Sequence, residues 1–492
     1  MVARPFAAAP EFVNLLSGRP PMRSLFPAFV TLLVAAPSFA QSERTLEQIP
    51  DLRSLPDATE RLQRDIDNGG GNLLLADKVT RITRPLVFDL KRHGAISVRA
   101  TGGATLIMDG PGPAILLRGT HEGTASPKSF RPETWHQRMP VVSGIEILGA
   151  HPEADGVELQ GTVGAILEQL SIRWCRHGIH LTVRNRNVIV SQCHLYENSG
   201  VGLYLDDVNL HQINVGDSHV SYNRQGGIVV RDGNVRNLQV TGCDIEGNMP
   251  EDETPTTTAN ILIDVSGTPD DKSRSVAEVA ITGCTIQHAA NYSGSQDKTV
   301  APGGANIRLA GKAVWPIDSV TITGNVLSDT TTNIDMYHCN DIVVASNNFF
   351  APRPANLNVR ECRRVVVSGN TFHPRQFVRP GTITFTDSAD CIVSNNVLHS
   401  LATDQGSLIL QNCSGFTLSG LNLSDCGSGI RLRETSDTLI SRCHVMRTAD
   451  GFPDIDIDAT NQNIHLTANV FSGEQIVEET ALAVSADAAA GR

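Results

Sequence analysis

The sequence predicts an all-β solenoid, in which short strands from successive repeats stack into long parallel sheets. Three observations favour this fold class. One pattern recurs about every 22 to 26 residues, and each copy holds three short alternating runs separated by Gly, Asn or Ser. The composition combines 42 Gly with only 5% aromatic residues. Because strands this short cannot form a sheet within one copy, each has to pair with the next copy.

The repeat is clearest in two neighbouring stretches, "NVIVSQCHLYENSGVGLYLDDVN" and "INVGDSHVSYNRQGGIVVRDGN". A small-residue turn precedes an apolar strand in both. Since turns of this kind run through most of the chain, we expect one domain. The turns are Ser191-Gln192-Cys193, Gly216-Asp217-Ser218, Thr241-Gly242-Cys243, Thr282-Gly283-Cys284, Thr323-Gly324-Asn325, Ser346-Asn347-Asn348, Ser368-Gly369-Asn370, Ser394-Asn395-Asn396 and Ser441-Arg442-Cys443.

The repeats "SGNTF", "TGNVLSD", "ASNNFF" and "TGCDIEGN" resemble the parallel β-helix repeat of the pectate lyase-like superfamily. The resemblance covers roughly residues 140–472. It implies a single-stranded right-handed parallel β-helix, which we expect over residues 79–472 with about a dozen coils. It also implies that a ligand lies on an outer face, because a filled β-helix has no internal cavity, and that glycosidic-bond cleavage is the commonest chemistry.

The N-terminal segment has the pattern of an export signal. Met22-Arg23 precedes an apolar run at residues 25–36 that is too short to span a bilayer, and Ser38-Phe39-Ala40 fits a signal-peptidase site. We therefore expect residues 1–40 to be a signal peptide, with Met22 as the better start, and the protein to be secreted or periplasmic.

Residues 41–78 are predicted to contain a short helix at residues 58–67, followed by Gly69-Gly70-Gly71. This arrangement resembles the helix that caps the N-terminal end of such solenoids. A cap is needed because an open end exposes apolar residues and strand edges. Residues 473–492 are expected to form a closing or disordered tail.

Asparagines and cysteines share the small-residue turn. The resulting column predicts a ladder of side-chain amides, with about 4.8 Å between rungs, at Asn325, Asn348, Asn370, Asn396 and Asn469. Cysteines in the same register are expected to be small buried wall residues. The pairs Cys243 with Cys284 and Cys339 with Cys362 lie on successive coils, so either a disulfide or two free thiols is compatible with each.

The strand that begins each coil has a clear alternation, as in "GLYLD" and "NILID". Its second and fourth residues should point inward and its third and fifth outward. The predicted inward set is Ile179, Leu181, Leu203, Leu205, Ile228, Val230, Ile261, Ile263, Ile307, Leu309, Ile334 and Met336.

The outward residues of these strands form a stripe of acids, bases and rings. Two long loops, at residues 246–259 and 287–305, lead into the strands that carry Asp264 and Arg308. Loops of this length in a solenoid are more often functional than accidental, so we expect them to wall a groove. The stripe contains Glu158, Gln160, His180, Thr182, Tyr204, Asp206, Val229, Arg231, Leu262, Asp264, Arg308, Ala310, Asp335, Tyr337, Asn358 and Arg360.

Two chemistries on a polysaccharide compete for this groove. Hydrolysis, which we favour, would use paired carboxyl groups: Asp264 with Asp206 or Asp335 as acid and base. A lyase would instead use arginines to neutralise a uronate carboxylate and a ring to carry protons. The proposed substrate-binding set is Arg308, Arg231, Tyr204, His180, Tyr337 and Arg360.

Two readings without catalysis also remain. Alternating Asp and Arg on adjacent rungs is what a solvated parallel sheet uses to avoid stacking like charges. A carbohydrate-binding or surface-adhesion solenoid would use the same groove. The polygalacturonase set "NTD", "GHG" and "RIK" and the pectate lyase motifs "WxDH" and "RxPxxR" are absent from the sequence, so neither the enzyme family nor pectin as the substrate is assigned.

The remaining features limit partners and cofactors. A formal charge of −12 without a long basic cluster excludes nucleic acid as an evident partner, and no later segment is apolar enough for membrane insertion. No CxxC or HxxxH spacing predicts a metal, although Asp456 and Asp458 in "DIDID" could bind Ca²⁺. We therefore expect a polysaccharide partner and no required cofactor, and we predict no oligomeric state.

Overall fold

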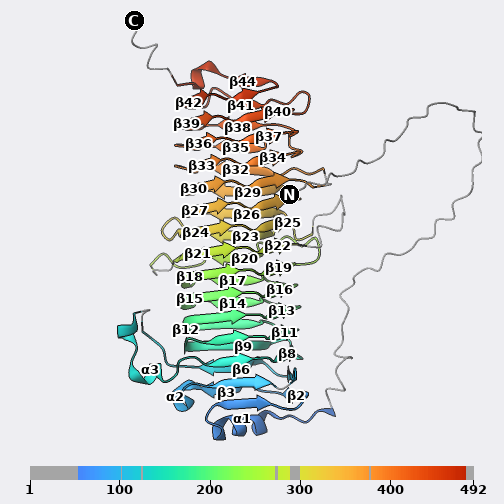
Figure 1. Ribbon diagram of the computed structural model, residues 1–492, viewed down its shortest axis with the longest axis vertical. Coiled ribbons are helices and arrows are strands. Elements are labelled where there is room, and N and C mark those ends of the chain that lie inside the picture. The colour runs from blue at the N-terminus through green and yellow to red at the C-terminus, as the bar shows by residue number, and fades with distance from the viewer. Residues whose placement is uncertain are drawn as a thin grey trace, which may run out of the picture. The chain divides into compact units, whose positions relative to one another are not determined.

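The computed structural model describes residues 54–483, apart from residues 101, 124–125, 272–274, 289–299 and 376–377. The predicted signal peptide and the end of the tail lie outside these residues. Within them the chain is a right-handed parallel β-helix, which confirms the predicted fold (Figure 1). Its strands form three long faces, and every pairing between strands is parallel.

The first face begins each coil and carries the candidate site. It contains β3 (Leu86–Asp89), β6 (Gly112–Arg118), β9 (Ala154–Val163), β12 (Ile179–Ser191), β14 (Leu203–Asp206), β17 (Ile228–Arg231), β20 (Ala259–Asp264), β23 (Ala305–Ala310), β26 (Thr332–Tyr337), β29 (Ala355–Arg360), β32 (Thr382–Thr386), β35 (Leu408–Gln411), β38 (Ile430–Arg433), β41 (Ile455–Ile457) and β44 (Gln475–Val477).

The second face joins the first through the long strand β12, whose two halves belong to both faces. Its other members are β1 (Asn72–Leu75), β4 (Ser97–Ala100), β7 (Val141–Ser143), β10 (Ile166–Glu168), β15 (Asn209–Gly216), β18 (Asn234–Thr241), β21 (Val276–Thr282), β24 (Ile317–Thr323), β27 (Cys339–Ala345), β30 (Arg363–Ser368), β33 (Ile392–Ser394), β36 (Thr417–Ser419), β39 (Ser436–Ser441) and β42 (Gln462–Thr467).

The third face is a separate 15-stranded sheet. It contains β2 (Val79–Ile82), β5 (Thr105–Met108), β8 (Glu146–Gly149), β11 (Ser171–Arg173), β13 (His194–Tyr196), β16 (His219–Ser221), β19 (Asp244–Glu246), β22 (Thr285–Gln287), β25 (Val326–Ser328), β28 (Asn348–Phe350), β31 (Thr371–His373), β34 (Val397–His399), β37 (Asn422–Ser424), β40 (His444–Met446) and β43 (Val470–Phe471).

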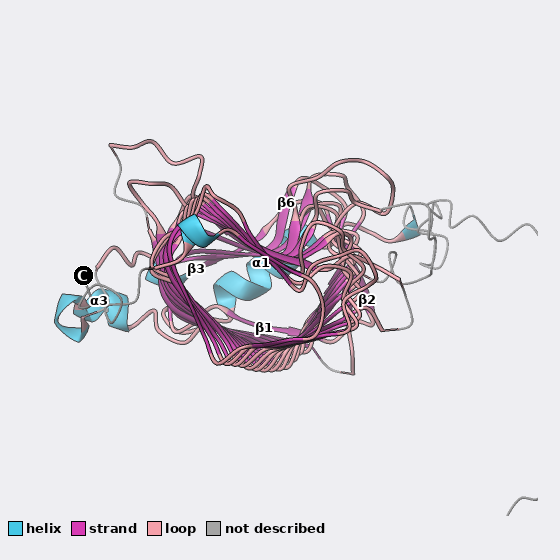
Figure 2. Ribbon diagram, turned by 90° about the horizontal axis from the view of Figure 1, so that it is seen from above, coloured by secondary structure: helices cyan, strands magenta, loops and turns pink. Residues whose placement is uncertain are grey.

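A helix covers the N-terminal end of the apolar core. Helix α1 (Thr59–Asn68) buries Leu62 and Ile66, and Gly69 follows its last residue. Figure 2 shows α1 lying across the opening that the three faces surround. The remaining helices are short: α2 (Leu90–His93), α3 (Pro132–Trp135), η3 (Pro127–Ser129) and η4 (Glu479–Ala481). No helix of the described residues has the length and apolar character needed to cross a bilayer.

The predicted register of the first face is confirmed. All twelve predicted inward residues, from Ile179 to Met336, have no exposed surface. They belong to one apolar core that runs the length of the solenoid. Because a shift of one residue would turn every side chain to the opposite face, this burial also fixes the direction of the candidate site residues.

The predicted amide ladder forms over four rungs, with corrections at Asn348 and Asn469. Asn325, Asn347, Asn370 and Asn396 are buried, and each donates from Nδ2 to Oδ1 of the next at 3.0 Å. The prediction of Asn348 was wrong by one residue: it is exposed at the start of β28, because Val326 rather than Asn325 is its strand partner. Asn469 has the predicted register, since its Oδ1 accepts from the Cys443 backbone N–H at 2.9 Å. It does not belong to the ladder, because Leu421 and Cys443 occupy the two rungs between it and Asn396, and its Nδ2 donates to the Ile440 carbonyl.

A second ladder occupies the turn between the third and first faces, and the sequence prediction missed it. Hydrogen bonds of 2.7–2.9 Å join successive side-chain amides along it. Its first members lie in the loops that follow third-face strands, whereas its later members lie at the beginning of first-face strands. The spacing of these asparagines in the sequence is therefore irregular, which hides the ladder. Its members are Asn198, Asn223, Asn248, Asn260, Asn306, Asn333 and Asn356.

All ten cysteines are buried and present as free thiols. A disulfide was compatible with two pairs, Cys243 with Cys284 and Cys339 with Cys362. Each pair lies on successive coils, and the Cys339 backbone N–H lies 3.3 Å from Cys362 Sγ. The thiols fill the wall of the core in the manner of small apolar side chains.

Candidate functional site

The outward residues of the first face form two adjacent columns. One column contains Glu158, His180, Tyr204, Val229, Leu262, Arg308, Asp335 and Asn358, and the other contains Gln160, Asp206, Arg231, Asp264, Ala310, Tyr337 and Arg360. The structure separates the predicted site residues into two groups along these columns. His180, Tyr204, Asp206, Arg231 and Asp264 lie together, and Arg308, Asp335, Tyr337 and Arg360 lie on later coils.

A group of rings and charges marks the first of these regions. We call His177, His180, Tyr204, Asp206 and Arg231 the His-Tyr-Arg cluster. The rings of His180 and Tyr204 stack almost parallel, at 5° and a centroid distance of 5.2 Å. His177 contacts both rings, at 5.3 and 5.1 Å. His180 Nε2 lies 3.2 Å from Asp206 Oδ2, so the carboxylate orients the imidazole.

The cluster keeps its proton carriers in defined states. Hydrogen bonding from His180, aided by Tyr204, lowers the pKa of Asp206, which stays a carboxylate. Burial, followed by the nearby charge of Asp206, raises the pKa of Tyr204 to about 12, so Tyr204 keeps its proton. Burial lowers the pKa of His177 to about 4. Because the Val201 amide donates to His177 Nδ1 at 3.1 Å, the neutral ring carries its proton on Nε2.

Two cavities open beside the cluster and share Arg231. The first, of about 380 Å³, is lined by His177, Val201, Tyr204, Gln225, Val229, Arg231 and Thr258. The second, of about 170 Å³, is lined by Asp206, Asp207, Arg231, Asp232, Gly267, Thr268 and Pro269. Arg231 donates from Nη1 to Asp264 Oδ2 at 2.9 Å, and its side chain remains 44% exposed. Asp264 also accepts from the backbone and hydroxyl of Ser266.

The first long loop buries an apolar patch at the edge of the first cavity. Val229 and Leu262 point outward but are at most 2% exposed, because Val201, Ala259 and Ala305 pack with them outside the main core. Tyr204 packs against the same patch. Val201 and Val229 of this patch line the first cavity and give it an apolar part.

Arg308 joins the two long loops and does not line the cavity. It donates to the carbonyl oxygens of Thr257 and Thr258 in the first loop and to that of Gly303 in the second, at 2.6 Å. Its Nε donates to Asp335 at 2.9 Å, and Asp335 also accepts from Arg360 at 3.0 Å. The Asp335 side chain is 11% exposed between these two guanidinium groups.

Tyr337 and Arg360 lie beside a third hollow, farther along the solenoid. The Arg360 guanidinium is 5.5 Å from the Tyr337 ring centroid, and the His338 ring is 4.0 Å from that of Tyr337. The hollow, of about 610 Å³, includes His338, Asn340, Glu361, Arg363 and Asp387 in its lining. His338 Nε2 lies 3.4 Å from Glu361 Oε2, so an imidazole, a carboxylate, a phenol and a guanidinium also meet here. The His-Tyr-Arg cluster differs in its second imidazole, and its Tyr204 and Arg231 line a cavity themselves.

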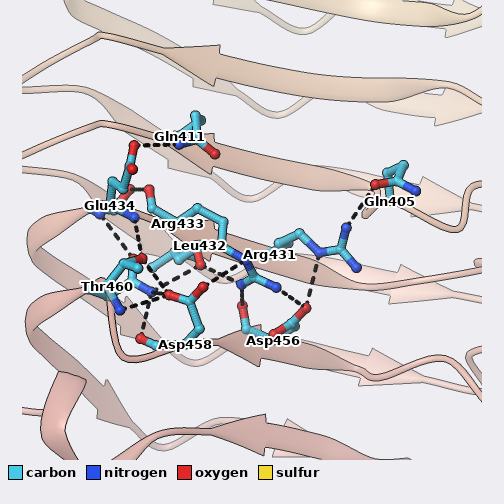
Figure 3. Close-up of polar contacts among 11 residues, drawn as sticks. Gln405, Gln411, Arg431, Leu432, Arg433, Glu434, Asp456, Asp458 and Thr460 are labelled. Atoms are coloured by element: carbon cyan, nitrogen blue, oxygen red, sulfur yellow. Dashed lines mark hydrogen bonds and ion pairs between the residues drawn. The ribbon is translucent and has the colours of Figure 1, made fainter.

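The two aspartates considered for Ca²⁺ face arginines. Asp456 accepts from Arg431 at 3.1 Å and from Arg433 at 2.5 Å, and Asp458 lies 3.0 Å from Arg433 Nε (Figure 3). Asp458 also accepts from Thr460 and Asn461. A cation here would have to displace two guanidinium groups, so these contacts are those of an ion-pair network.

Sequence reasoning found every member of the His-Tyr-Arg cluster except His177. His177 lies in the turn before β12 and outside the period-two pattern from which the stripe was derived. The signal that identifies it is "HGIH", in which Gly178 leads the strand and His177 turns back toward the ring of Tyr204.

Two family profiles match parts of the chain. The profile "Right handed beta helix region" matches residues 143–268, and "Periplasmic copper-binding protein (NosD)" matches residues 278–482. Among curated proteins, none matches the sequence significantly.

The comparison with solved structures gives matches of low sequence identity. The A-module of Azotobacter vinelandii mannuronan C-5 epimerase AlgE4 is 12% identical, with a TM-score of 0.46 over 76% of this chain and 94% of that chain. Bacteriophage CBA120 tailspike protein 3 is 11% identical, with a TM-score of 0.46 over 88% of this chain and 62% of that chain. PfbA, a surface adhesin of Streptococcus pneumoniae, is 12% identical, with a TM-score of 0.43 over 82% of this chain and 89% of that chain.

The described residues do not fit a copper site. No group of three or more His, Cys, Asp or Glu side chains among them is arranged to hold a metal ion. The thiols that would suit copper are buried in the solenoid wall, and two pairs of them, Cys243 with Cys284 and Cys339 with Cys362, are neighbours there.

Proposed function

Because the chain belongs to the right-handed parallel β-helix proteins, whose ligands lie on an outer face, we propose that the His-Tyr-Arg cluster acts on an acidic polysaccharide. The proposed reaction is β-elimination at a uronate residue. The single observation that carries the proposal is the gathering of two imidazoles, a phenol, a carboxylate and a guanidinium beside cavities that share Arg231. Export, as expected from residues 1–40, would bring the protein to such a substrate.

Each step of the elimination has a candidate group. Arg231 binds the uronate carboxylate and offsets the charge that develops when the proton beside it leaves. His180 takes that proton from C5; its Nε2–H faces Asp206, so Nδ1 holds the accepting lone pair. The electron pair forms the double bond between C4 and C5, and the C4–O bond breaks.

Tyr204 supplies the proton to the departing oxygen. Its raised pKa keeps the phenol protonated until the C4–O bond breaks. The charged Asp206 stabilises the imidazolium that forms on His180. His177, with a proton fixed on Nε2, donates a hydrogen bond to a substrate oxygen in the first cavity. Solvent then takes the proton from His180 and restores the proton on Tyr204.

The contacts of the carboxyl groups favour this chemistry over the hydrolysis that we first expected. A hydrolase needs one carboxyl that is protonated near neutral pH. Asp335 lies between two arginines, Asp264 is paired with Arg231, and Asp206 has a lowered pKa. Hydrolysis by Asp264 with Asp206 or Asp335 remains the alternative, and the products distinguish it.

The experiment is a panel of acidic polysaccharides of different uronate composition incubated with the purified protein. We expect unsaturated uronate ends, detected by ultraviolet absorbance and mass spectrometry. New reducing ends without unsaturation would instead indicate hydrolysis. Binding of a glycan without either product would identify a carbohydrate-binding solenoid.

A pair of variants tests the roles. Tyr204→Phe removes only the phenolic hydroxyl and should lower turnover at least about 100-fold. Tyr196→Phe is the matched control, because Tyr196 lies on the third face of the same repeat and its hydroxyl accepts from Arg173 at 3.2 Å. Equal activity in the two variants would contradict the role of Tyr204.

A further inference from the structure

A second group of basic side chains, three guanidinium groups and two imidazoles, lies on the outer side of the second face. Burial lowers the pKa of His121 and of His211 to about 4, so both imidazoles are neutral near pH 7 and the positive charge belongs to the arginines. We call Arg184, Arg186, Arg236, His121 and His211 the cationic cluster. Arg186, His211 and Arg236 stack on successive rungs of β12, β15 and β18, and Arg184 lies two residues before Arg186. The segment between β6 and β7 adds His121, whose ring stacks on Phe130 at 5.0 Å. None of the five belongs to the candidate active site.

The floor of the cationic cluster is buried and lacks hydrogen-bond partners. Arg186 is 1% exposed, yet neither Nε nor Nη1 has a partner. His121 is 2% exposed with Nε2 unpartnered, and Arg184 Nε is also unpartnered. Leaving such groups without acceptors is costly, and for a buried charge the cost is larger still. Two neutral acceptors on the rungs that follow Arg184, Asn209 Oδ1 and Asn234 Oδ1, are buried and unpartnered as well. A neutral amide does not compensate a buried guanidinium charge, so the unpartnered donors point to an anionic acceptor.

The described residues supply no compensating acid. No Asp or Glu among them forms an ion pair with Arg184, Arg186 or Arg236, and the contact recorded for Arg236 is from Nη2 to the Ser275 hydroxyl at 2.6 Å. Burial, followed by the charge of Arg184, lowers the pKa of Arg186 to about 10. Elsewhere on the solenoid, buried or half-buried guanidinium groups such as Arg308 and Arg433 face an aspartate.

We propose that the cationic cluster binds a small oxyanion. Arg186 and His121 form its floor, while the partly exposed Arg184, His211 and Arg236 form its entrance. Planar guanidinium forks match the oxygen pairs of phosphate, sulfate or carboxylate groups. Because the floor is almost fully enclosed, the site suits a single anionic group and not the length of a polymer. The same chemistry can come from a free inorganic ion or from the acidic group of a sugar.

The test measures thermal unfolding of the purified protein in phosphate, sulfate or glucuronate, each compared with chloride at equal ionic strength. An occupied site should raise the unfolding midpoint by about 2 °C or more at a saturating anion concentration. A shift with phosphate or sulfate would identify an inorganic oxyanion as the source. A shift with glucuronate alone would identify the carboxylate of an acidic sugar. The readout involves no activity, so it is independent of the proposed elimination.

Arg186→Met keeps the aliphatic stem but removes the charge. We expect it to abolish the anion-dependent shift, and to unfold in chloride at a midpoint no lower than that of the natural protein, since an unpaired buried charge is lost. The matched control is Arg442→Met, at an exposed turn position distant in sequence, which should keep the shift. Calorimetric titration of the natural protein with phosphate, sulfate and glucuronate gives a second measurement if the variant fails to fold. The absence of both shift and binding heat for every anion, or a shift that persists in Arg186→Met, would overturn the proposal.

Discussion

Replacing Asn347 by Ala should destabilise the solenoid strongly, because this amide makes four buried hydrogen bonds. Its Oδ1 accepts from the backbone and the side chain of Asn325, at 2.9 and 3.0 Å. Its Nδ2 donates to the Ile322 carbonyl at 2.9 Å and to Asn370 Oδ1 at 3.0 Å. Asn370 Oδ1 still accepts from the backbone N–H of Asn347, which the substitution does not remove, so losing the side-chain donor to Asn370 costs less free energy. At about 1 kcal/mol for each lost bond, the free energy of unfolding should fall by about 3 kcal/mol.

The assay is urea unfolding followed by circular dichroism, with Asn348→Ala as the matched control. Asn348 is the next residue along the chain, but it is exposed and its side chain accepts only from Thr371 and His373. We expect its loss to cost less than about 0.5 kcal/mol. Hydrogen exchange should also quicken at the Asn325 amide in Asn347→Ala. If the two variants were equally stable, the amide ladder would not stabilise this fold and the reasoning would fail.

Three further predictions follow from the burial of titratable side chains and from the hydrogen bonds of Arg308. His288 is 1% exposed, and burial lowers its pKa to about 4. The stability that its neutral form contributes should be complete above pH 6.5 and should be lost as the pH falls toward 4. His288→Gln should flatten this loss in melting curves measured at different pH values. Burial raises the pKa of Cys193 to about 11 and that of Cys391 to about 12. Iodoacetamide should therefore label these two thiols only after unfolding, as measured by mass spectrometry. Rapid labelling of the folded protein would contradict this prediction. Arg308→Ala should speed hydrogen exchange in residues 254–258, because Arg308 donates hydrogen bonds to the carbonyl oxygens of Thr257 and Thr258. Unchanged exchange in this segment would show that other contacts hold the loop.

The fold was predictable because its periods are short and redundant. Inward positions such as Ile261 and Ile263 repeat on every coil, so one misread repeat does not change the register. The error at Asn348 arose where the sequence offers two adjacent asparagines, Asn347 and Asn348, and the turn alone does not show which one faces the core. The second ladder escaped because Asn248 lies in a loop while its partner Asn260 leads a strand.

The candidate site was only partly predictable, because the alternation of a strand gives direction but not contact. It placed Asp206 and Arg231 on the outer side of the first face, and the structure has both there beside a cavity. It gave no indication that Arg308 would turn to the loop carbonyls, since that depends on where two long loops pass. His177 lies before its strand, where no period applies.

Charge pairing along the solenoid separates supporting contacts from candidate sites. Where Arg and Asp occupy adjoining rungs, as in Arg308 with Asp335 or Arg431 with Asp456, each charge is compensated and the pair only stabilises the sheet. Two of the regions described above depart from this pattern. At His180 and Tyr204 the rungs carry groups that move protons, and at Arg184 and Arg186 they carry cations without acids. A sheet that needed only solubility would gain nothing from either departure, so these two regions are where substrate and ion should be sought.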